Sequence, residues 1–215
     1  MKISIVYDNT LHPGNSDLIA DWGFSAFIEF AEKKILFDTG GNGQILMQNL
    51  YNLELDPTEI TDIFISHGDF DHIGGLSHLL NLNQTAVIHS PVSFRGIRYQ
   101  NAVKYYQDSC EIYPNIFSSG ELGAREQSLF IKTAKGLVVI SGCAHPGVQK
   151  ILQVAQKFGK VYALIGGLHG FDQFQLLEDI TEICATHCSK YKAEIARIYP
   201  NKYLSGGVGR TIIIS

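Results

Sequence analysis

The most informative part of the chain is the stretch Ser66-His67-Gly68-Asp69-Phe70-Asp71-His72-Ile73-Gly74-Gly75. It places two histidines and two aspartates directly after the apolar run Ile63-Phe64-Ile65. Imidazole and carboxylate groups together suit zinc, iron and manganese, and a strand that leaves a sheet can direct such side chains at one point. The alternative, a solvated loop or helix cap, does not account for the buried strand before the motif or the Gly-Gly after it. We therefore interpret the stretch as a metal site.

The composition limits what this site can belong to. The chain has 215 residues, of which 45% are hydrophobic and 18% charged, and this predicts a single globular domain over residues 1–215. A net charge of −4 and scattered lysines and arginines give no indication of nucleic-acid binding. The sequence has neither a membrane-length apolar run nor a signal peptide, and its four cysteines lack paired CxxC spacing. We expect a cytoplasmic protein with reduced thiols and a small-molecule substrate, of open oligomeric state, without a membrane partner.

Short apolar strands alternate with helices along the chain. Strands rich in Ile, Val and Phe are predicted at residues 2–7, 24–30, 34–37, 62–66, 85–89, 128–133, 137–141, 161–165, 180–186 and 211–215. Helices are predicted at residues 43–53, 74–80, 147–157 and 189–199. The alternation indicates a layered α/β fold.

Several predicted strands end in a polar residue beside glycine. Asp38, His67, His145 and His169 follow apolar runs with glycine nearby, and His187 follows another apolar run without a glycine. In layered α/β proteins ligand sites collect at strand ends, where glycines let loops approach one another closely. These residues therefore predict one shared cleft. Residues 90–127 are the least regular region and are expected to form either a lid or substrate-contacting segment, or a surface insertion.

The order of the motifs resembles that of the metallo-β-lactamase superfamily. His67-x-Asp69-x-Asp71-His72 is preceded by Asp38-Thr39-Gly40 and followed by Gly142-Cys143-Ala144-His145. The ordered set covers nearly the whole chain. Within the superfamily, the chain looks most like the branch of the dihydropterin-ribofuranosylaminobenzene phosphate synthases. The motifs that carry this likeness are Asp8-Asn9-Thr10, Trp22-Gly23-Phe24-Ser25, Ser119-Gly120-Glu121, Gly142-Cys143-Ala144-His145, Gly166-Gly167-Leu168-His169 and Thr186-His187-Cys188-Ser189.

The resemblance implies an α/β fold, an αββα four-layer sandwich with one or two divalent metal ions at one edge of the sheets. In the usual HxHxDH pattern, His67 matches a ligand of the first metal, and Asp71 and His72 match ligands of the second. Asp69 stands where a second histidine is usual. A carboxylate there is a harder ligand, which shifts the preference from zinc toward iron or manganese. The aspartate side chain is also shorter than a histidine and does not necessarily reach the metal. The alternative to a two-metal site is therefore a half-degenerate site that binds one ion.

The resemblance also suggests roles for the later motifs. His145 is expected to be a further ligand of the first metal and His187 of the second. Cys143 lies where many relatives carry a bridging aspartate, and it is either a bridging thiolate or a small buried hydrophobe. His169 is expected to contact the substrate or to support a ligand. Asp38 is expected to orient a metal-binding histidine.

Such a site indicates metal-dependent hydrolysis. One or two divalent ions, with zinc expected and iron or manganese as alternatives, lower the pKa of bound water and polarise a carbonyl or phosphoryl oxygen. Asp71 would hold the metal and could accept a proton as the nucleophile forms. We expect an enzyme that hydrolyses a small-molecule ester, phosphoester or lactone-like substrate. Two alternatives stay open: a non-catalytic ligand-binding protein with a degenerate metal site, and a diiron redox protein.

Overall fold

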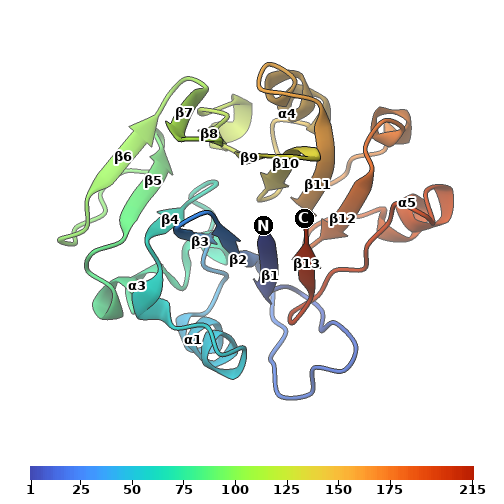
Figure 1. Ribbon diagram of the computed structural model, residues 1–215. Helices are drawn as coiled ribbons and strands as arrows, with labels where there is room; N and C mark the ends of the chain where they lie inside the picture. The colour runs from blue at the N-terminus through green and yellow to red at the C-terminus, as the bar shows by residue number, and fades with distance from the viewer.

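The computed structural model describes residues 1–215, apart from the side chain of Ala124. Two β-sheets pack face to face, and helices lie outside them (Figure 1). The predicted αββα sandwich is therefore confirmed. Within the described residues, none of the helices is long and apolar enough to cross a membrane.

The first sheet contains both ends of the chain, which lie side by side in Figure 1. Its seven strands run in the order β13-β1-β2-β3-β4-β5-β6. They are β1 (Lys2–Tyr7), β2 (Ser25–Phe30), β3 (Lys33–Phe37), β4 (Asp62–Phe64), β5 (Val87–Pro91), β6 (Val103–Tyr106) and β13 (Thr211–Ile213). The pairings from β3 through β6 are parallel, and the remaining pairings are antiparallel.

The second sheet has six strands in the order β12-β11-β10-β9-β8-β7. They are β7 (Cys110–Tyr113), β8 (Ile116–Ser118), β9 (Leu129–Thr133), β10 (Gly136–Ser141), β11 (Val161–Gly167) and β12 (Glu182–Thr186). Strands β10, β11 and β12 pair in parallel, whereas β7, β8, β9 and β10 pair antiparallel.

The helices and single turns complete the layers. The α-helices are α1 (Gly43–Asn52), α2 (Phe70–Ile73), α3 (Leu76–Leu82), α4 (Val148–Ala155) and α5 (Lys192–Ile198). The 3₁₀ turns are η1 (Pro57–Glu59), η2 (Gly123–Arg125) and η3 (Phe174–Leu177). Helix α1 begins after Asn42, whose side chain accepts hydrogen bonds from the backbone N–H groups of Gln44 and Ile45 and so caps the helix.

The alternation of side chains along each strand divides the core into layers. In β1, Ile3 and Ile5 belong to the core between the sheets, whereas Val6 packs in the cluster that includes Leu46 and Leu50 of α1. Helix α4 buries four apolar residues, at the helical spacing that its sequence predicts, against the other face of the second sheet. Burial of each large aliphatic side chain contributes about 1.5–3 kcal/mol, so these layers hold the sheets in register.

A buried polar cluster joins the two sheets at the start of β4. Asp62 lies 2.7 Å from Nε2 of His89, accepts a 2.7 Å hydrogen bond from the Tyr113 hydroxyl, and pairs with Lys33 at 3.0 Å. Burial alone would raise the pKa of Asp62, but these hydrogen bonds, with one from Thr61, hold it well below its usual range. His89 is therefore a structural histidine, at the other end of β4 from the metal motif.

The parallel strands direct the predicted functional residues to one edge. Asp38 follows β3, the His67 motif follows β4, and the Cys143 loop follows β10. His169 and His187 follow β11 and β12. Because the carboxyl ends of parallel strands face the same way, these loops meet where the two sheets approach.

Residues 90–127 are more regular than their sequence indicates. This region is not a surface insertion throughout, because β6 extends the first sheet and β7 and β8 extend the second. These strands are short and mostly half-buried, so they lack the apolar runs by which the other strands were recognised. Only the flanking parts approach the predicted cleft, where Ser93, Phe94 and Arg125 share a pocket with His67. A role for the region as a lid or substrate-contacting segment stays a prediction.

Candidate metal centre

Two groups of possible ligand atoms converge at the carboxyl ends of the strands. The first group is His67, Cys143 and His145, and the second is His72, Cys143 and His187. Within each group, one nitrogen or sulfur atom per residue lies within 4.8 Å of the others. Cys143 is common to both groups, so its sulfur lies between them, as a bridging ligand would.

Asp71 and Asp69 lie differently around these groups. One oxygen of Asp71 is 3.2 Å from Nε2 of His187 and 3.8 Å from Nε2 of His72, at the second group. Asp69 has a side chain that is 64% exposed, and its carboxylate lies 3.3 Å from Nε2 of His67, at the solvent side of the first group. The structure thus brings Asp71 into the centre and leaves Asp69 at its rim. Whether each of these residues binds metal stays a prediction.

The two histidines of the His67 motif are fixed through their Nδ1 atoms. Nδ1 of His72 lies 2.7 Å from Asp38, and Nδ1 of His67 lies 2.8 Å from the hydroxyl of Ser66. Asp38 also accepts hydrogen bonds from the backbone N–H and the hydroxyl of Ser66. Gly142 permits this arrangement, because a Cβ there would lie 2.2 Å from the Ser66 oxygen. Asp38 therefore has the orienting position that the sequence predicts for it.

His145 is fixed by Glu126, a buried residue that the sequence analysis missed. One Glu126 oxygen lies 3.1 Å from Nδ1 of His145 and accepts the His145 backbone N–H at 2.9 Å. The other accepts the backbone N–H groups of Cys143 and Ala144 at 3.0 and 2.8 Å. One carboxylate thus holds the whole loop that carries two of the candidate ligands.

His187 is fixed by the turn at the end of β1, residues 8–9. Nδ1 of His187 lies 3.0 Å from the side-chain oxygen of Asn9, and the His187 backbone N–H donates to Asp8 at 3.0 Å. The backbone of His187 is left-handed, with φ of 47°, as is that of Asp38, with φ of 52°. Non-glycine residues adopt this conformation at an energetic cost, which the surrounding hydrogen bonds offset.

The donor set fits a metal ion. The four histidine rings, those of His67, His72, His145 and His187, each have Nδ1 beside a neighbouring side chain, which leaves Nε2 to face the centre. A side chain that binds the second ring nitrogen in this way is the usual support of a metal-binding histidine. Among the described side chains, the buried Nε2 atoms of His67 and His187 lie near the carboxylates of Asp69 and Asp71 but make no well-aligned hydrogen bond. Buried polar atoms without partners are costly, and a cation would satisfy them. Nitrogen and sulfur ligands with a nearby carboxylate suit zinc or iron.

Charges within the centre shift the pKa values of its groups. Burial lowers the pKa of His67, and the neighbouring charge of His72 adds to this effect. Burial also acts to lower the pKa of His72, but Asp38 outweighs it and the pKa is raised. The hydrogen bond to Glu126 raises the pKa of His145, and contact with His187 lowers that of Asp71. Asp71 is therefore an anion at neutral pH, which suits a ligand of a cation.

A second thiol, missed by the sequence analysis, lies against Cys143. The Sγ atom of Cys188, the residue after His187, is 3.2 Å from Sγ of Cys143. Their contact raises the pKa of Cys143 and lowers that of Cys188 to about 5. Glu126 shares no spacing motif with the ligands, because only the strand register brings it to the centre. Asn9 and Cys188 lie in two of the motifs that carry the family resemblance, Asp8-Asn9-Thr10 and Thr186-His187-Cys188-Ser189, but the resemblance assigns no role to either residue.

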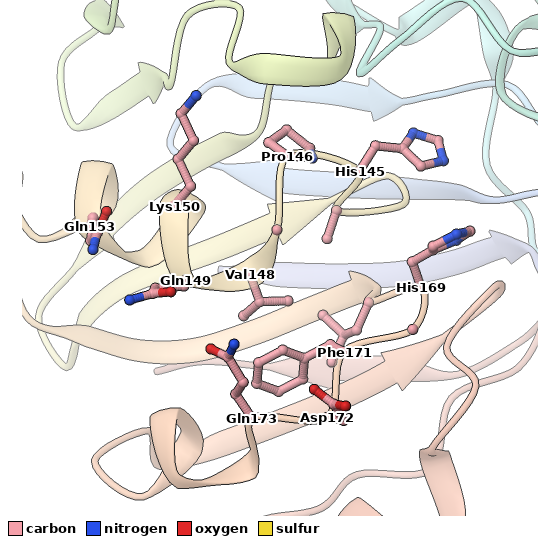
Figure 2. A pocket seen from close by; sticks show the side chains of 14 residues that line it. His145, Pro146, Val148, Gln149, Lys150, Gln153, His169, Phe171, Asp172 and Gln173 are labelled. Atoms are coloured by element: carbon pink, nitrogen blue, oxygen red, sulfur yellow. The ribbon is translucent and has the colours of Figure 1, made fainter.

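A pocket of about 590 Å³ opens beside the first group. Figure 2 shows His145 and His169 at one end, with Lys150 and Gln153 of α4 toward the other. The rings of His145 and His169 are 5.2 Å apart, and His169 is exposed. Phe171 provides an apolar wall. His169 thus lies beside the centre and lines the pocket, and its contact with a bound molecule stays a prediction.

The αββα fold thus carries a candidate metal centre at the ends of its strands. The sequence profile of the metallo-beta-lactamase superfamily matches residues 23–121. The chain is 26% identical to the 7,8-dihydropterin-6-methyl-4-(beta-D-ribofuranosyl)-aminobenzene-5'-phosphate synthase of Methanocaldococcus jannaschii, over 84% of this chain and 85% of that protein.

Solved structures agree in fold. The crystal structure of a metal-dependent hydrolase of the beta-lactamase superfamily superimposes with a TM-score of 0.82 at 23% identity, covering 100% of this chain and 99% of the other. Human tRNase Z, short form, superimposes with a TM-score of 0.67 at 16% identity, covering 100% of both chains. The resemblance to the metallo-β-lactamase superfamily is therefore confirmed, in sequence over residues 23–121 and in fold over the whole chain.

Proposed function

We propose that the protein is a metal-dependent hydrolase with two metal positions that share Cys143. The observation that carries this proposal is the convergence of four imidazoles on one sulfur, each ring fixed through Nδ1 by an outer partner. Such preorganisation strains the backbone and buries polar atoms, which a purely structural cluster would not require. Asp69 by itself favours iron or manganese, because a carboxylate is a hard ligand. Zinc is nevertheless the expected ion, because the thiolate and the imidazoles make the donor set as a whole softer.

The residues of the chain have distinct roles in this proposal. His67, His145 and Cys143 would hold one ion, and His72, His187, Asp71 and Cys143 the other. When bound, the ions supply an activated water and polarise the scissile carbonyl or phosphoryl oxygen. Asp71 has a lowered pKa, so it is a weak base, and its main role is to hold charge and orient the nucleophile.

The pocket beside His145 supports a small-molecule substrate with a charged or polar end. A cavity of about 590 Å³ is of the size that usually holds such ligands. With the scissile group at the centre, His169 would contact the leaving part and Phe171 its apolar portion. Lys150 and Gln153 lie at the far end, where they would bind an anion or hydrogen-bonding groups. A phosphoester or carboxylate-bearing ester matches this order of groups.

Metal content per chain, measured by mass spectrometry on protein purified without chelators, is the first test. Two equivalents of zinc, with hydrolysis of members of a panel of phosphoesters, esters and lactones, are the expected result. Two equivalents of iron would favour redox chemistry instead. Protein that binds no ion after reconstitution would overturn the proposal and favour a ligand-binding protein.

A synthase reaction is the second candidate. It is favoured by the similarity to the M. jannaschii synthase over most of both chains. The same centre would then activate a phosphorylated substrate for bond formation rather than hydrolysis. The two parts of the product named for that synthase are a 6-methyl dihydropterin and a ribofuranosylaminobenzene 5'-phosphate. Incubation of the zinc-loaded protein with an activated 6-methyl dihydropterin and a ribofuranosylaminobenzene phosphate, followed by mass spectrometry of the products, distinguishes the two reactions. A coupled product without hydrolysis would favour the synthase.

A further inference from the structure

Two thiols from different strand ends meet at the centre. Cys143 follows β10 and Cys188 follows β12, with β11 between these strands in the sheet. Their sulfur atoms are nevertheless 3.2 Å apart, and both cysteines are free. The sulfur of Cys188 also lies 3.8 Å from the carbonyl oxygen of Cys143. Sulfurs this close are at van der Waals contact or nearer, so the fold holds the two thiols against each other.

The end of β11 leaves space for this contact. Gly167, the last residue of β11, pairs with Thr186 of β12, the strand that leads to Cys188. A Cβ at position 167 would lie 2.8 Å from the Cys188 sulfur and 3.2 Å from Cα of Cys143. Any larger residue would therefore force the two cysteines apart. Glycine at this position lets two loops that are not sheet neighbours touch across the intervening strand.

The sulfur atoms of Cys143 and Cys188 are separated by little more than the length of a disulfide bond. That bond is about 2.05 Å long, so the two sulfur atoms must approach by about 1.2 Å for it to form. Cys188 is half-buried, whereas Cys143 is buried beneath it among the candidate ligands. An oxidant from solvent thus meets Cys188 first.

The other two cysteines differ in environment, because Cys184 is fully buried in β12 and Cys110 lies in β7, at the far edge of the second sheet.

We propose that Cys143 and Cys188 are a redox modification site, at which a peroxide oxidant closes a reversible disulfide. The Cys188 sulfur takes one oxygen atom from the peroxide and becomes a sulfenic acid, with release of one water. The Cys143 sulfur then attacks the Cys188 sulfur, the S–S bond forms and the S–O bond breaks. The hydroxyl leaves with the thiol proton as a second water. Two thiols lose two electrons, and hydrogen peroxide is reduced to two waters.

The modification would act directly on the metal centre. Cys143 belongs to both groups of candidate ligands, and a disulfide sulfur no longer offers a thiolate. Closure of the bond therefore removes one ligand from each metal position at once. This consequence rests on the proposed function, whereas formation of the disulfide itself does not. Bound metal and disulfide exclude each other, so the ions protect the thiols and oxidation releases the ions.

Peptide mapping after oxidation tests the proposal. The full chain, as chelator-treated protein and as zinc-loaded protein, is incubated with hydrogen peroxide, alkylated, digested and analysed by mass spectrometry. The expected result is a peptide linking Cys143 to Cys188, a fall from four titratable thiols to two, and reversal by dithiothreitol. The linkage should form faster in the chelator-treated protein, and a zinc-sensitive dye should report release from the loaded protein.

Variants separate this site from general oxidation. C188S should bind zinc but release less of it under peroxide than the wild type, and should form no intramolecular link. C110S is the matched control and should behave as the wild type. The wild-type protein alone can overturn the proposal. It would do so if Cys143 and Cys188 stayed thiols under peroxide, or became sulfinic or sulfonic acids without a disulfide between them. A disulfide in a protein that never binds metal would instead overturn the proposed function and leave the modification site standing.

Discussion

The Glu126 carboxylate lies 3.1 Å from Nδ1 of His145 and also accepts the backbone N–H groups of residues 143 to 145. Burial alone would raise the pKa of Glu126, but these hydrogen bonds and the charge of His67 lower it to about 2. The acid is therefore ionised whenever the protein is folded at neutral pH. It fixes the loop and the ring together, so Cys143 and His145 reach the centre as one unit.

Replacing Glu126 with glutamine should weaken metal binding at the first group. The amide keeps the volume but loses the charge that orients His145, and loss of such an outer partner typically costs 10–100-fold in metal affinity. Competition with a chromogenic chelator measures the affinity. Glu32→Gln, at an exposed position, is the matched control and should leave the affinity unchanged. Equal affinities in E126Q and the wild type would show that the loop needs no charged anchor.

The Asp62 cluster should make the fold sensitive to acid. The pKa of Asp62 is lowered in the folded chain, so its stabilisation is complete above the unfolded value of about 4 and is lost as pH falls through the folded value. Asp62→Asn should reduce the free energy of unfolding by about 3 kcal/mol at pH 7, since it leaves Lys33 and His89 without their buried partner. The difference from the wild type should shrink between pH 4 and pH 2.

Urea unfolding of the metal-free protein, followed by circular dichroism, measures this difference. Asp179→Asn, an exposed substitution of the same kind, is the control and should change stability by less than about 0.5 kcal/mol. A D62N–wild-type difference that is constant from pH 7 to pH 2 would mean that the charge of Asp62 contributes nothing to the pH dependence.

Removing the carboxylate of Asp71 should affect the second group alone. Asp71→Ala takes away the oxygen that lies 3.2 Å from Nε2 of His187 and leaves the first group intact. The expected result is loss of about one zinc equivalent and of nearly all hydrolytic activity, with an unchanged circular dichroism spectrum. Metal content and activity are measured on the same preparation. Full activity with a single bound ion would contradict a mechanism that uses both positions.

The sequence predicts the strands and the convergence of their ends because both depend on local patterns. Buried strands contain continuous apolar runs, and the polar residue after each run marks where it leaves the sheet, as at His67 and His187. The sheet register then follows from the fold that the motifs resemble. Strands β6 to β8 were not recognised, because their residues are half-buried or the strands are only three or four residues long.

The outer partners of the histidines could not be predicted in the same way. Glu126 is 17 to 19 residues away from the backbone groups that it binds, and no spacing rule connects it with them. The contact of Cys188 with Cys143 depends on the register of β11 with β12 and on the missing side chain of Gly167. Such contacts are properties of the tertiary structure. The resemblance to a superfamily implies ligands, but not the particular residues that hold them in this chain.

Changing Asp69 to histidine tests the departure of this chain from the common ligand pattern. Asp69 lies at the exposed rim, 3.3 Å from Nε2 of His67, and an imidazole is longer than a carboxylate and softer as a ligand. Asp69→His should therefore raise zinc affinity at the first group by about tenfold, measured by chelator competition. Asp69→Ala should leave the fold unchanged, because the side chain is largely exposed. If D69H and the wild type bind zinc equally, position 69 does not contribute a ligand.

Lys150 should select for anionic substrates. It lies at the far end of the pocket from His145 and His169, where the charged end of a bound substrate would be. Lys150→Gln should raise KM for a phosphoester or carboxylate-bearing ester by about 3–10-fold, the loss of one exposed charge interaction of about 1 kcal/mol, with little change in kcat. A neutral ester should show no change in either constant. Lys157→Gln, an exposed position beyond the pocket, is the matched control.

Two outcomes would contradict this role of Lys150. A fall in kcat with constant KM would place Lys150 in the chemical step instead. Equal effects on neutral and anionic esters would show that charge is not the basis of recognition.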